Sequence, residues 1–469
     1  MNANIPVQEA AAPPASPRGH GIGFGEAVRT WARIAALSFG GPAGQIAVMH
    51  RILVDEKRWI GEARFLHALN YCMLLPGPEA QQLAIYIGWL LHRTKGGLVA
   101  GILFVLPGFL AILALSYVFV LLGHRPEVEG LFFGLKAAVL AIVLQAVVRI
   151  GSRAIKTRVM LGIAVAAFLA IFLFNTPFPL IVLVAGCVGW VAARMEWSAI
   201  RAGSGHGGGA DGFDDAYSAL GEALPDHARP NLAWSLKTNG ALLALWAAPV
   251  VALLGIFGPE NVYSRIAMFF SKMAVVTFGG AYAVLAYVAQ QAVGTYHWLQ
   301  PGEMLNGLGM AETTPGPLII VVQFVGFLAG YRDPGSIPPL MAATLAAILT
   351  VWVTFVPCFL WIFLGAPFIE RLRHNRALAT ALAAITAAVV GVIVNLAVWF
   401  AFHSLFQRQI PVSIAGVRIE LPALSSVDAP ALLLTLAAIL ATFRFKLGTF
   451  VVLGVCSAVG LLLAVSGIV

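Results

Sequence analysis

Two short motifs rich in glycine and proline interrupt apolar stretches near the N-terminus. They are Phe39-Gly40-Gly41-Pro42 and Leu75-Pro76-Gly77-Pro78. Glycine pairs and proline break helices, because proline lacks a backbone donor and clashes with the preceding turn. A helix broken at membrane depth must line a cavity or be buried in protein, since lipid cannot satisfy the freed amides. Its N–H groups and positive helix ends are suited to binding an anion, although glycine that only permits close helix packing explains one such motif equally well.

Both motifs recur in the second half of the chain. Arg33 to Gly41 resembles Lys272 to Gly280 at an offset of 239 residues, and the same offset relates the two Pro-Gly-Pro motifs. The pair Trp59 and Trp298 also has this offset, and we interpret both residues as belonging to an interface belt. A second offset, of 250 residues, relates Pro107-Gly108 to Pro357-Cys358 and Gln145 to Asn395. The chain therefore contains an internal repeat, and duplication of both motifs favours a functional role for them.

Charged and amide side chains inside the apolar segments are further candidates. Arg33 and Lys272 share one repeat position and either attract an anion or anchor a helix end, and Lys136 is a more deeply placed cation. Glu79 and Glu312 are candidate proton carriers, although capping of a helix N-terminus also suits Glu79. The predicted substrate-binding residues are Gly40, Gly41, Pro42, Gln45, Pro76, Gly77, Pro78, Gly279, Gly280, Pro315, Gly316, Pro317, Arg33, Lys272, Lys136, Gln145 and Asn395.

The composition indicates a polytopic membrane protein. The chain is 60% hydrophobic and 11% charged, whereas soluble domains carry about 25% charged residues. The net charge of +8 resides largely in short loops between apolar runs, so we interpret it as a topology signal and expect no nucleic-acid partner. The four cysteines are scattered, without the spacing of a zinc site or a disulfide framework. We expect no metal and no cofactor.

Apolar runs predict about 13 transmembrane helices in an all-α fold. We expect a disordered tail at 1–21, a first repeat at 22–194, a flexible polar linker at 195–238, a connecting helix at 239–258 and a second repeat at 259–469. Because six spans return the chain to its starting side and one more span moves it across, the second repeat is inverted relative to the first. Inverted repeats are typical of secondary transporters.

The basic residues predict a cytoplasmic N-terminus and a C-terminus outside. One loop does not fit, because Arg51, Lys57, Arg58 and Arg64 would then lie outside. Either nearby acidic residues accompany them at the surface, or the Phe-Gly-Gly segment is re-entrant and does not cross the membrane. The sequence leaves both alternatives open.

The motifs resemble those of the chromate ion transporter superfamily in its long, two-domain form. The resemblance rests on Phe39 to Gln45, on the stretch from Leu75 through Trp89, on Phe278-Gly279-Gly280 and on Ala311 to Pro317. It implies a protein of the cytoplasmic membrane that exports chromate and confers resistance, driven by the membrane potential or a proton gradient. The second copy has Ala281-Tyr282 where the first has proline, so the two halves are not equivalent.

Other function classes fit less well. No Gly-x-x-x-x-Gly-Lys-Ser/Thr motif is present for an ATP-driven pump, and neither Gly-x-Ser-x-Gly nor His-Glu-x-x-His is present for a membrane enzyme. A sulfate importer or oxyanion channel of the same architecture is the main alternative, because chromate and sulfate are both tetrahedral dianions. The expected partners are this dianion, the lipid bilayer and protons, and a homodimer stays open.

Overall fold

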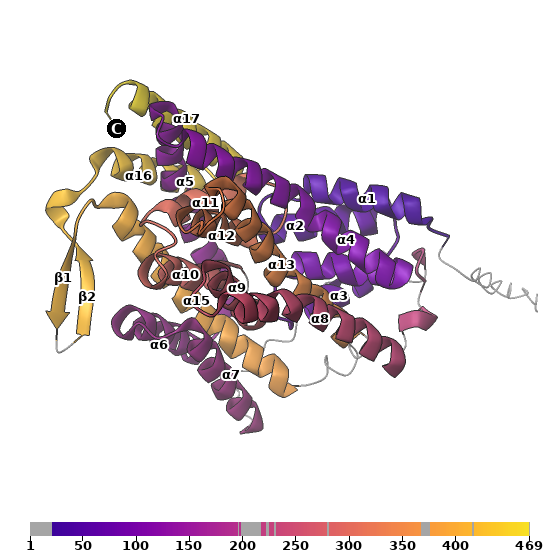
Figure 1. Cartoon of the computed structure of the whole chain (residues 1–469). Helices are drawn as coiled ribbons and strands as arrows, with labels where there is room; N and C mark the ends of the chain where they lie inside the picture. The colour runs from indigo at the N-terminus through magenta and orange to yellow at the C-terminus, as the bar shows by residue number, and fades with distance from the viewer. Residues whose placement is uncertain are drawn as a thin grey trace, which may run out of the picture.

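The computed structural model describes residues 21–195, 197, 217–221, 225–228, 231–278, 281–366, 376–414 and 417–468. The described chain is almost entirely helical (Figure 1). Five of its helices are long and apolar enough to cross a membrane: Glu79–Leu122, Pro126–Ala154, Ala233–Phe257, Pro339–Gly365 and Ala377–Leu405. The expected all-α polytopic membrane fold is confirmed.

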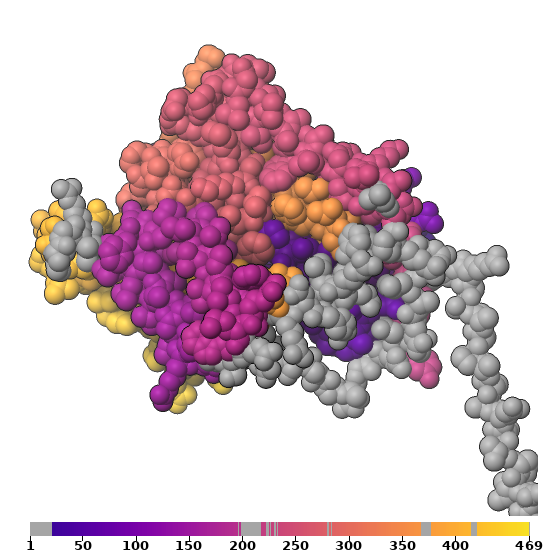
Figure 2. All heavy atoms as spheres, turned by 90° about the horizontal axis from the view of Figure 1, so that it is seen from below, coloured from indigo at the N-terminus to yellow at the C-terminus, as the bar shows by residue number. Residues whose placement is uncertain are grey.

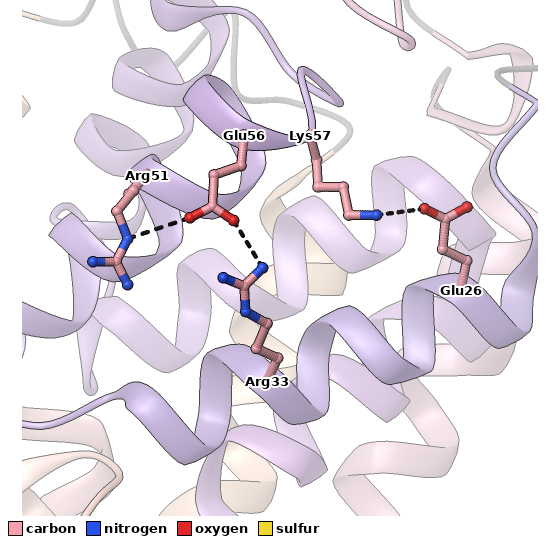
Figure 3. A network of polar contacts seen from close by, with 5 residues as sticks. All are labelled: Glu26, Arg33, Arg51, Glu56 and Lys57. Atoms are coloured by element: carbon pink, nitrogen blue, oxygen red, sulfur yellow. Dashed lines mark hydrogen bonds and ion pairs between the residues drawn. The ribbon is translucent and has the colours of Figure 1, made fainter.

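The first apolar segment is a hairpin of two short helices, although the sequence predicts one helix there. Helix α1 (Phe24–Leu37) ends before Ser38, and α2 (Gly41–His50) continues into the π-helix η1 (Arg51–Glu56). Lys57, at the end of this hairpin, pairs with Glu26 in the first turn of α1 at 2.8 Å, and Glu56 pairs with Arg33 at 2.7 Å (Figure 3). Both ends of the segment therefore lie on the same side of the molecule. The structure thus favours the re-entrant alternative.

The second apolar segment also folds back. Helix α3 (Glu62–Cys72) leads to the Pro-Gly-Pro motif, and α4 (Glu79–Leu122) starts directly after it. Non-helical backbone at His92 and Arg93 divides α4 into a short arm and a long spanning helix. The ring nitrogen Nε2 of His92 lies 3.0 Å from the carbonyl oxygen of Ile22, so the short arm ends near the start of α1. This second hairpin therefore opens toward the same side as the first.

The second half repeats this arrangement. One hairpin is formed by α9 (Val262–Val276), α10 (Ala281–Gln290) and the π-helix η5 (Gln291–Thr295), and the other by α11 (Glu303–Thr313), η6 (Leu318–Ile320) and α12 (Val321–Arg332). Arg332, at the end of α12, binds Glu303, at the start of α11, through both carboxylate oxygens. Arg58 and His297, which are related by the 239-residue offset, both have positive φ. The repeat seen in the sequence is therefore also a repeat of backbone conformation.

The remaining helices join the two halves. Helix α5 packs against α16 and α17, and α15 packs against α6 and α7. These elements are α5 (Pro126–Ala154), α6 (Arg158–Phe174), α7 (Phe178–Arg194), α8 (Leu232–Phe257), α13 (Pro339–Gly365), α15 (Arg376–Leu405), α16 (Ala429–Phe443) and α17 (Thr449–Val465), with an antiparallel hairpin of β1 (Gln409–Ile414) and β2 (Val417–Pro422). Because each contact pairs one half with the other, neither half packs as an independent unit.

Helices α6 and α7 have a face at the surface of the molecule, which is visible from below in Figure 2. Exposed side chains on these helices include Leu161, Val165, Leu169, Leu183 and Val184. Such a face suits contact with lipid chains. The β-hairpin and the C-terminus lie at the left of Figure 1, and the start of α1 lies at the right. The two ends of the described chain therefore lie far apart in this view, and the predicted orientation of the termini stays a prediction.

Two expectations need correction. Trp59 and Trp298 are only 4% and 5% exposed, so they belong to the core rather than to an interface belt. The described parts of the predicted linker pack on the first half, because Ala219 N–H donates to the carbonyl of Arg58 and His227 lies 2.8 Å from the carbonyl of Trp89. The rest of that linker and residues 1–20 of the predicted tail (1–21) lie outside the described residues.

Candidate anion site at the hairpin tips

Two reciprocal hydrogen bonds join the tips of the four hairpins in two pairs, and each pair contains one tip from each half. The N–H of Gly77 donates to the carbonyl of Thr277, and the N–H of Gly316 donates to the carbonyl of Ser38, each with an N–O distance of 2.9 Å. The two bonds are equivalent in the repeat, because Gly77 matches Gly316 and Ser38 matches Thr277 at the offset of 239 residues. Gly77 and Gly316 have φ values of 128° and 103°, which favour glycine strongly. The broken segments of opposite halves therefore meet in the interior of the molecule.

Helices begin at this junction. Helix α2 starts at Gly41 with Pro42 in its first turn, α4 starts at Glu79 immediately after Pro78, and η6 starts at Leu318 after Pro317. The N-terminal N–H groups of a helix lack intrahelical partners and carry partial positive charge, so they bind anions without a cationic side chain.

Open space lies beside the first tip. Gly40 and Gly41 both have positive φ, and a Cβ atom built on either one meets no other atom within 4 Å. The backbone there can be approached by a ligand. Their counterparts Gly279 and Gly280 lie outside the described residues.

Buried amide side chains lie at the tips, and one of them connects two tips. The Nε2 of Gln45 donates to the carbonyl of Gly316 at 2.6 Å, and the Nε2 of Gln82 donates to the carbonyl of Pro76 at 2.7 Å. Gln81 is also fully buried, and neither polar atom of its side chain has a hydrogen-bond partner among the described residues. Because unpaired buried amides are costly, polar groups of this kind point to a ligand or water at the junction. The sequence alone indicates Gln81 and Gln82 as amides within an apolar segment, which either hydrogen-bond an oxyanion or bridge helices.

Each half holds the Pro-Gly-Pro tip of the other. Gly108 of α4 lies so close to the second tip that a Cβ atom there would stand 2.6 Å from the carbonyl oxygen of Pro315. Cys358 of α13 occupies the matching repeat position, and its Sγ atom would lie 3.2 Å from a Cβ atom built on Gly77. The sequence repeat contained this pair, but only the structure shows that each residue contacts the opposite half.

A carboxyl group is buried next to the second tip. Glu312 is 4% exposed and accepts a hydrogen bond from the hydroxyl of Tyr282. Arg149 of α5 lies within electrostatic range of both side chains. The first half has Met73 and Ala43 at the positions that match Glu312 and Tyr282. The pair is therefore specific to the second half. Glu79 occupies the first position of α4, where a helix N-terminus stabilises negative charge.

The three predicted cations do not meet at the tips. Arg33 is exposed and paired with Glu56, Lys272 is exposed on α9, and Lys136 lines a cavity near the β-hairpin. Arg33 on α1 and Lys272 on α9 occupy the same repeat position, and in both helices that position is exposed at the surface. Arg149, which sequence analysis missed because it lies near a predicted span end, is the cation that the structure brings near Glu312.

The repeat-matched amides lie apart from the tip motifs. Gln145 is partly buried on α5, one turn before Arg149, so the two side chains share a helix face. Asn395 of α15 lines a cavity of about 690 Å³ together with Asn175 and Gln290. Neither side chain makes a contact that links it to the Pro-Gly-Pro tips among the described hydrogen bonds.

An interior junction of broken helices from two repeats is an arrangement suited to a membrane transporter. The chain belongs to the chromate transporter family, whose family model matches residues 25–190 and 264–461. It is 27% identical over 416 residues to the "Chromate transport protein" of Cupriavidus metallidurans, covering 88% of this chain and 86% of that protein.

Two further relatives have similar names. Identity is 32% over 367 residues to the "Chromate transport protein" of Pseudomonas aeruginosa, with 77% of each chain covered. It is 28% over 386 residues to the "Probable chromate transport protein" of Synechococcus elongatus, with 82% of this chain and 86% of that protein covered. No solved structure shows significant similarity to the chain.

Proposed function

We propose that this protein exports chromate across the cytoplasmic membrane as a secondary transporter and so confers chromate resistance. The dianion binds where the four hairpin tips meet, through backbone N–H groups at Gly40, Gly41 and the starts of α2, α4 and η6. The observation that carries this proposal is the reciprocal pair of hydrogen bonds, Gly77 to Thr277 and Gly316 to Ser38, which joins the broken helices of both halves. Such a site recognises charge and shape without a metal or a cofactor.

Transport then proceeds by alternating access. The halves are inverted, so an opening on one side of the junction has a counterpart of the same construction on the other side. One pair of hairpins moves relative to the other. This movement breaks the Gly77–Thr277 hydrogen bond when the junction opens to one side of the membrane, and the Gly316–Ser38 hydrogen bond when it opens to the other side. Gly108 and Cys358 lie against the tips and limit how far each one moves.

The membrane potential supplies a driving force for export. We take the N-terminus to be cytoplasmic, as the distribution of Lys and Arg favours. The cytoplasm is electrically negative relative to the outside, so the membrane potential favours movement of an anion out of the cell. A potential of 100 mV is worth about 2.3 kcal/mol per elementary charge, and about twice that for an unaccompanied dianion. Export is therefore feasible without a co-transported proton.

Glu312 is the candidate for coupling to protons. Its carboxyl group accepts a hydrogen bond from Tyr282 and interacts electrostatically with Arg149, so the anion and Glu312 compete for the positive charge of Arg149. A dianion that engages Arg149 weakens the support for a charged Glu312, which then takes up a proton. Because the membrane potential alone can drive export, this proton uptake modulates transport and is not its sole driving force.

The test is chromate accumulation in energised everted membrane vesicles, with and without excess sulfate. Accumulation that collapses with the membrane potential supports export, and competition by sulfate indicates a site that reads charge and shape alone. Uptake into right-side-out vesicles, without accumulation in everted ones, contradicts export and favours a sulfate or oxyanion importer.

A further inference from the structure

A polar cavity of about 380 Å³ lies at the β-hairpin end of the molecule, apart from the four hairpin tips. It is lined by residues of α5, the end of α15, β1, the start of α16 and the segment that precedes α11; Figure 1 labels these elements. Its polar lining residues are Lys136, His403, Ser404, Gln407, Gln409 and Asp428. The proposed function makes no use of it.

Lys136 is the cation of this cavity. Among the described residues it has no hydrogen-bond or ion-pair partner, although it is partly buried on a helix of membrane-spanning length. Gly302 faces it with φ 90°, and a Cβ atom there would stand 3.7 Å from the Nζ atom. A glycine at this position therefore keeps the space beside the ammonium group open.

Two of the nearby carboxylates, Glu303 and Asp428, have partners other than Lys136. Glu129 and Glu303 lie within electrostatic range of Lys136. Glu303 binds both terminal nitrogens of Arg332 and accepts a hydrogen bond from the backbone N–H of Gln300. Asp428 lines the cavity but caps α16 by accepting the N–H of Ala431 at 2.9 Å. The ammonium group is thus left with unfilled donors, and a partly buried cation in that state favours an external anion.

Neutral polar groups complete the site. His403 donates from Nδ1 to the carbonyl of Trp399 at 2.9 Å, so in the neutral ring Nε2 is an acceptor and gives no hydrogen bond to an anion. Ser404, Gln407 and Gln409 add a hydroxyl and two amides. This set of one cation with several small donors suits an oxyanion of a few heavy atoms.

The cavity adjoins a second one, of about 690 Å³, with which it shares Pro301, His403 and Gln409. The larger cavity extends to Asn395 on α15 and to Gln290 beside η5. The larger cavity is lined by apolar side chains with Asn395, Gln290 and Glu420 among them, so the two cavities form a continuous space with scattered polar groups, as a route for an ion requires.

We propose that Lys136 and the polar groups around this cavity form a second oxyanion site, which the cargo occupies in transit at the β-hairpin end of the protein. The inference rests on the proposed function for the identity of the cargo, a tetrahedral dianion. It assigns to Lys136 a role separate from the hairpin tips.

Equilibrium dialysis of the purified, full-length protein against radiolabelled sulfate and chromate tests this proposal. The wild type is expected to bind about two anions per chain. Lys136→Gln should remove one of them or weaken it by about tenfold or more, because it deletes a charge-assisted contact. Lys136→Arg should keep it. Lys272→Gln is the matched control, since it removes an exposed cation that lines none of the described cavities.

The outcomes separate the two proposals. A wild type that binds one anion, with no change in Lys136→Gln, overturns the second site and leaves the tip site standing. Two anions in both proteins also overturn it, because the second anion then binds elsewhere. A wild type that binds neither sulfate nor chromate contradicts the proposed function and this inference together. Should Lys136→Gln fail to fold, Ser404→Ala together with Gln407→Ala is expected to weaken the same anion.

Discussion

At the scale of single residues, the tips depend on glycines that other residues replace poorly. Gly40→Val adds a branched side chain at φ 79° and places it in the open space beside the backbone. We expect chromate transport to fall by at least about tenfold while the protein remains in the membrane, since left-handed backbone costs an L-residue about 1–2 kcal/mol. Vesicle uptake and immunoblotting measure the two effects.

Gly25→Val is the control for that substitution. Gly25 lies in the first turn of α1, has ordinary φ and meets no atom within 4 Å. It should leave transport unchanged. Equal transport by the wild type and Gly40→Val would argue that the first tip does not contact the anion.

Arginines at two positions give a second prediction. Arg33 forms an exposed ion pair with Glu56, and such pairs contribute about 0–1 kcal/mol. Arg33→Gln should therefore transport nearly as well as the wild type. Arg149→Gln should lose transport by about tenfold or more, because it removes a cation that interacts electrostatically with Glu312. The reverse pattern in a vesicle assay would restore the expectation, drawn from the sequence, that Arg33 attracts the anion.

Glu312 gives a third prediction, concerning protons. Glu312→Gln keeps the shape of the side chain and its contact with the Tyr282 hydroxyl but cannot change its charge. We expect transport driven by an imposed potential to persist and the response to an imposed pH gradient to disappear. Tyr282→Phe should alter that response without removing it. A pH response of normal size in Glu312→Gln would exclude this carboxyl from coupling.

At the scale of elements, the short arm of α4 packs closely on the helix that follows it. A Cβ atom on Gly96 would lie 2.1 Å from the carbonyl oxygen of Gly88. Gly96→Val should separate the two arms and lower the melting temperature, because overpacking typically costs about 1–3 kcal/mol. Gly162→Val on α6 is the control, since nothing lies within 4 Å of that position. Equal melting temperatures for both variants would contradict the hairpin at His92 and Arg93.

Much of this element plan could be predicted from the sequence. Proline and glycine marked where helices break, and the repeat paired Pro76–Pro78 with Pro315–Pro317. Whether a broken segment crosses the membrane or returns could not be predicted, because length and hydropathy are the same in both cases. The answer depends on long-range contacts such as Lys57 with Glu26. For the same reason the sequence misplaced Arg33, whose partner is 23 residues away, and missed Arg149.

At the scale of the whole molecule, inversion of the halves predicts labelling from opposite sides. Asp55 and Gly294 share a repeat position, and both follow a hairpin tip. In a background that lacks the exposed Cys187, Asp55→Cys and Gly294→Cys should react with an impermeant maleimide from opposite faces of the membrane. Intact cells and everted vesicles compare the two faces. Labelling of both from one face would disprove the inverted arrangement.

The contacts between Gly77 and Thr277 and between Gly316 and Ser38 also bear on how such a chain originates. Each half supplies one donor and one acceptor, so either half alone leaves both of its groups without partners. Two copies of an ancestral half-length protein, inserted in opposite orientations, would satisfy them mutually. Gene fusion then requires one added helix to reverse the second copy, and α8 meets that requirement. With the proposed inversion of the halves, the full-length chain corresponds to a tethered antiparallel dimer, and Glu312 and Tyr282 are a pair that only its second half contains.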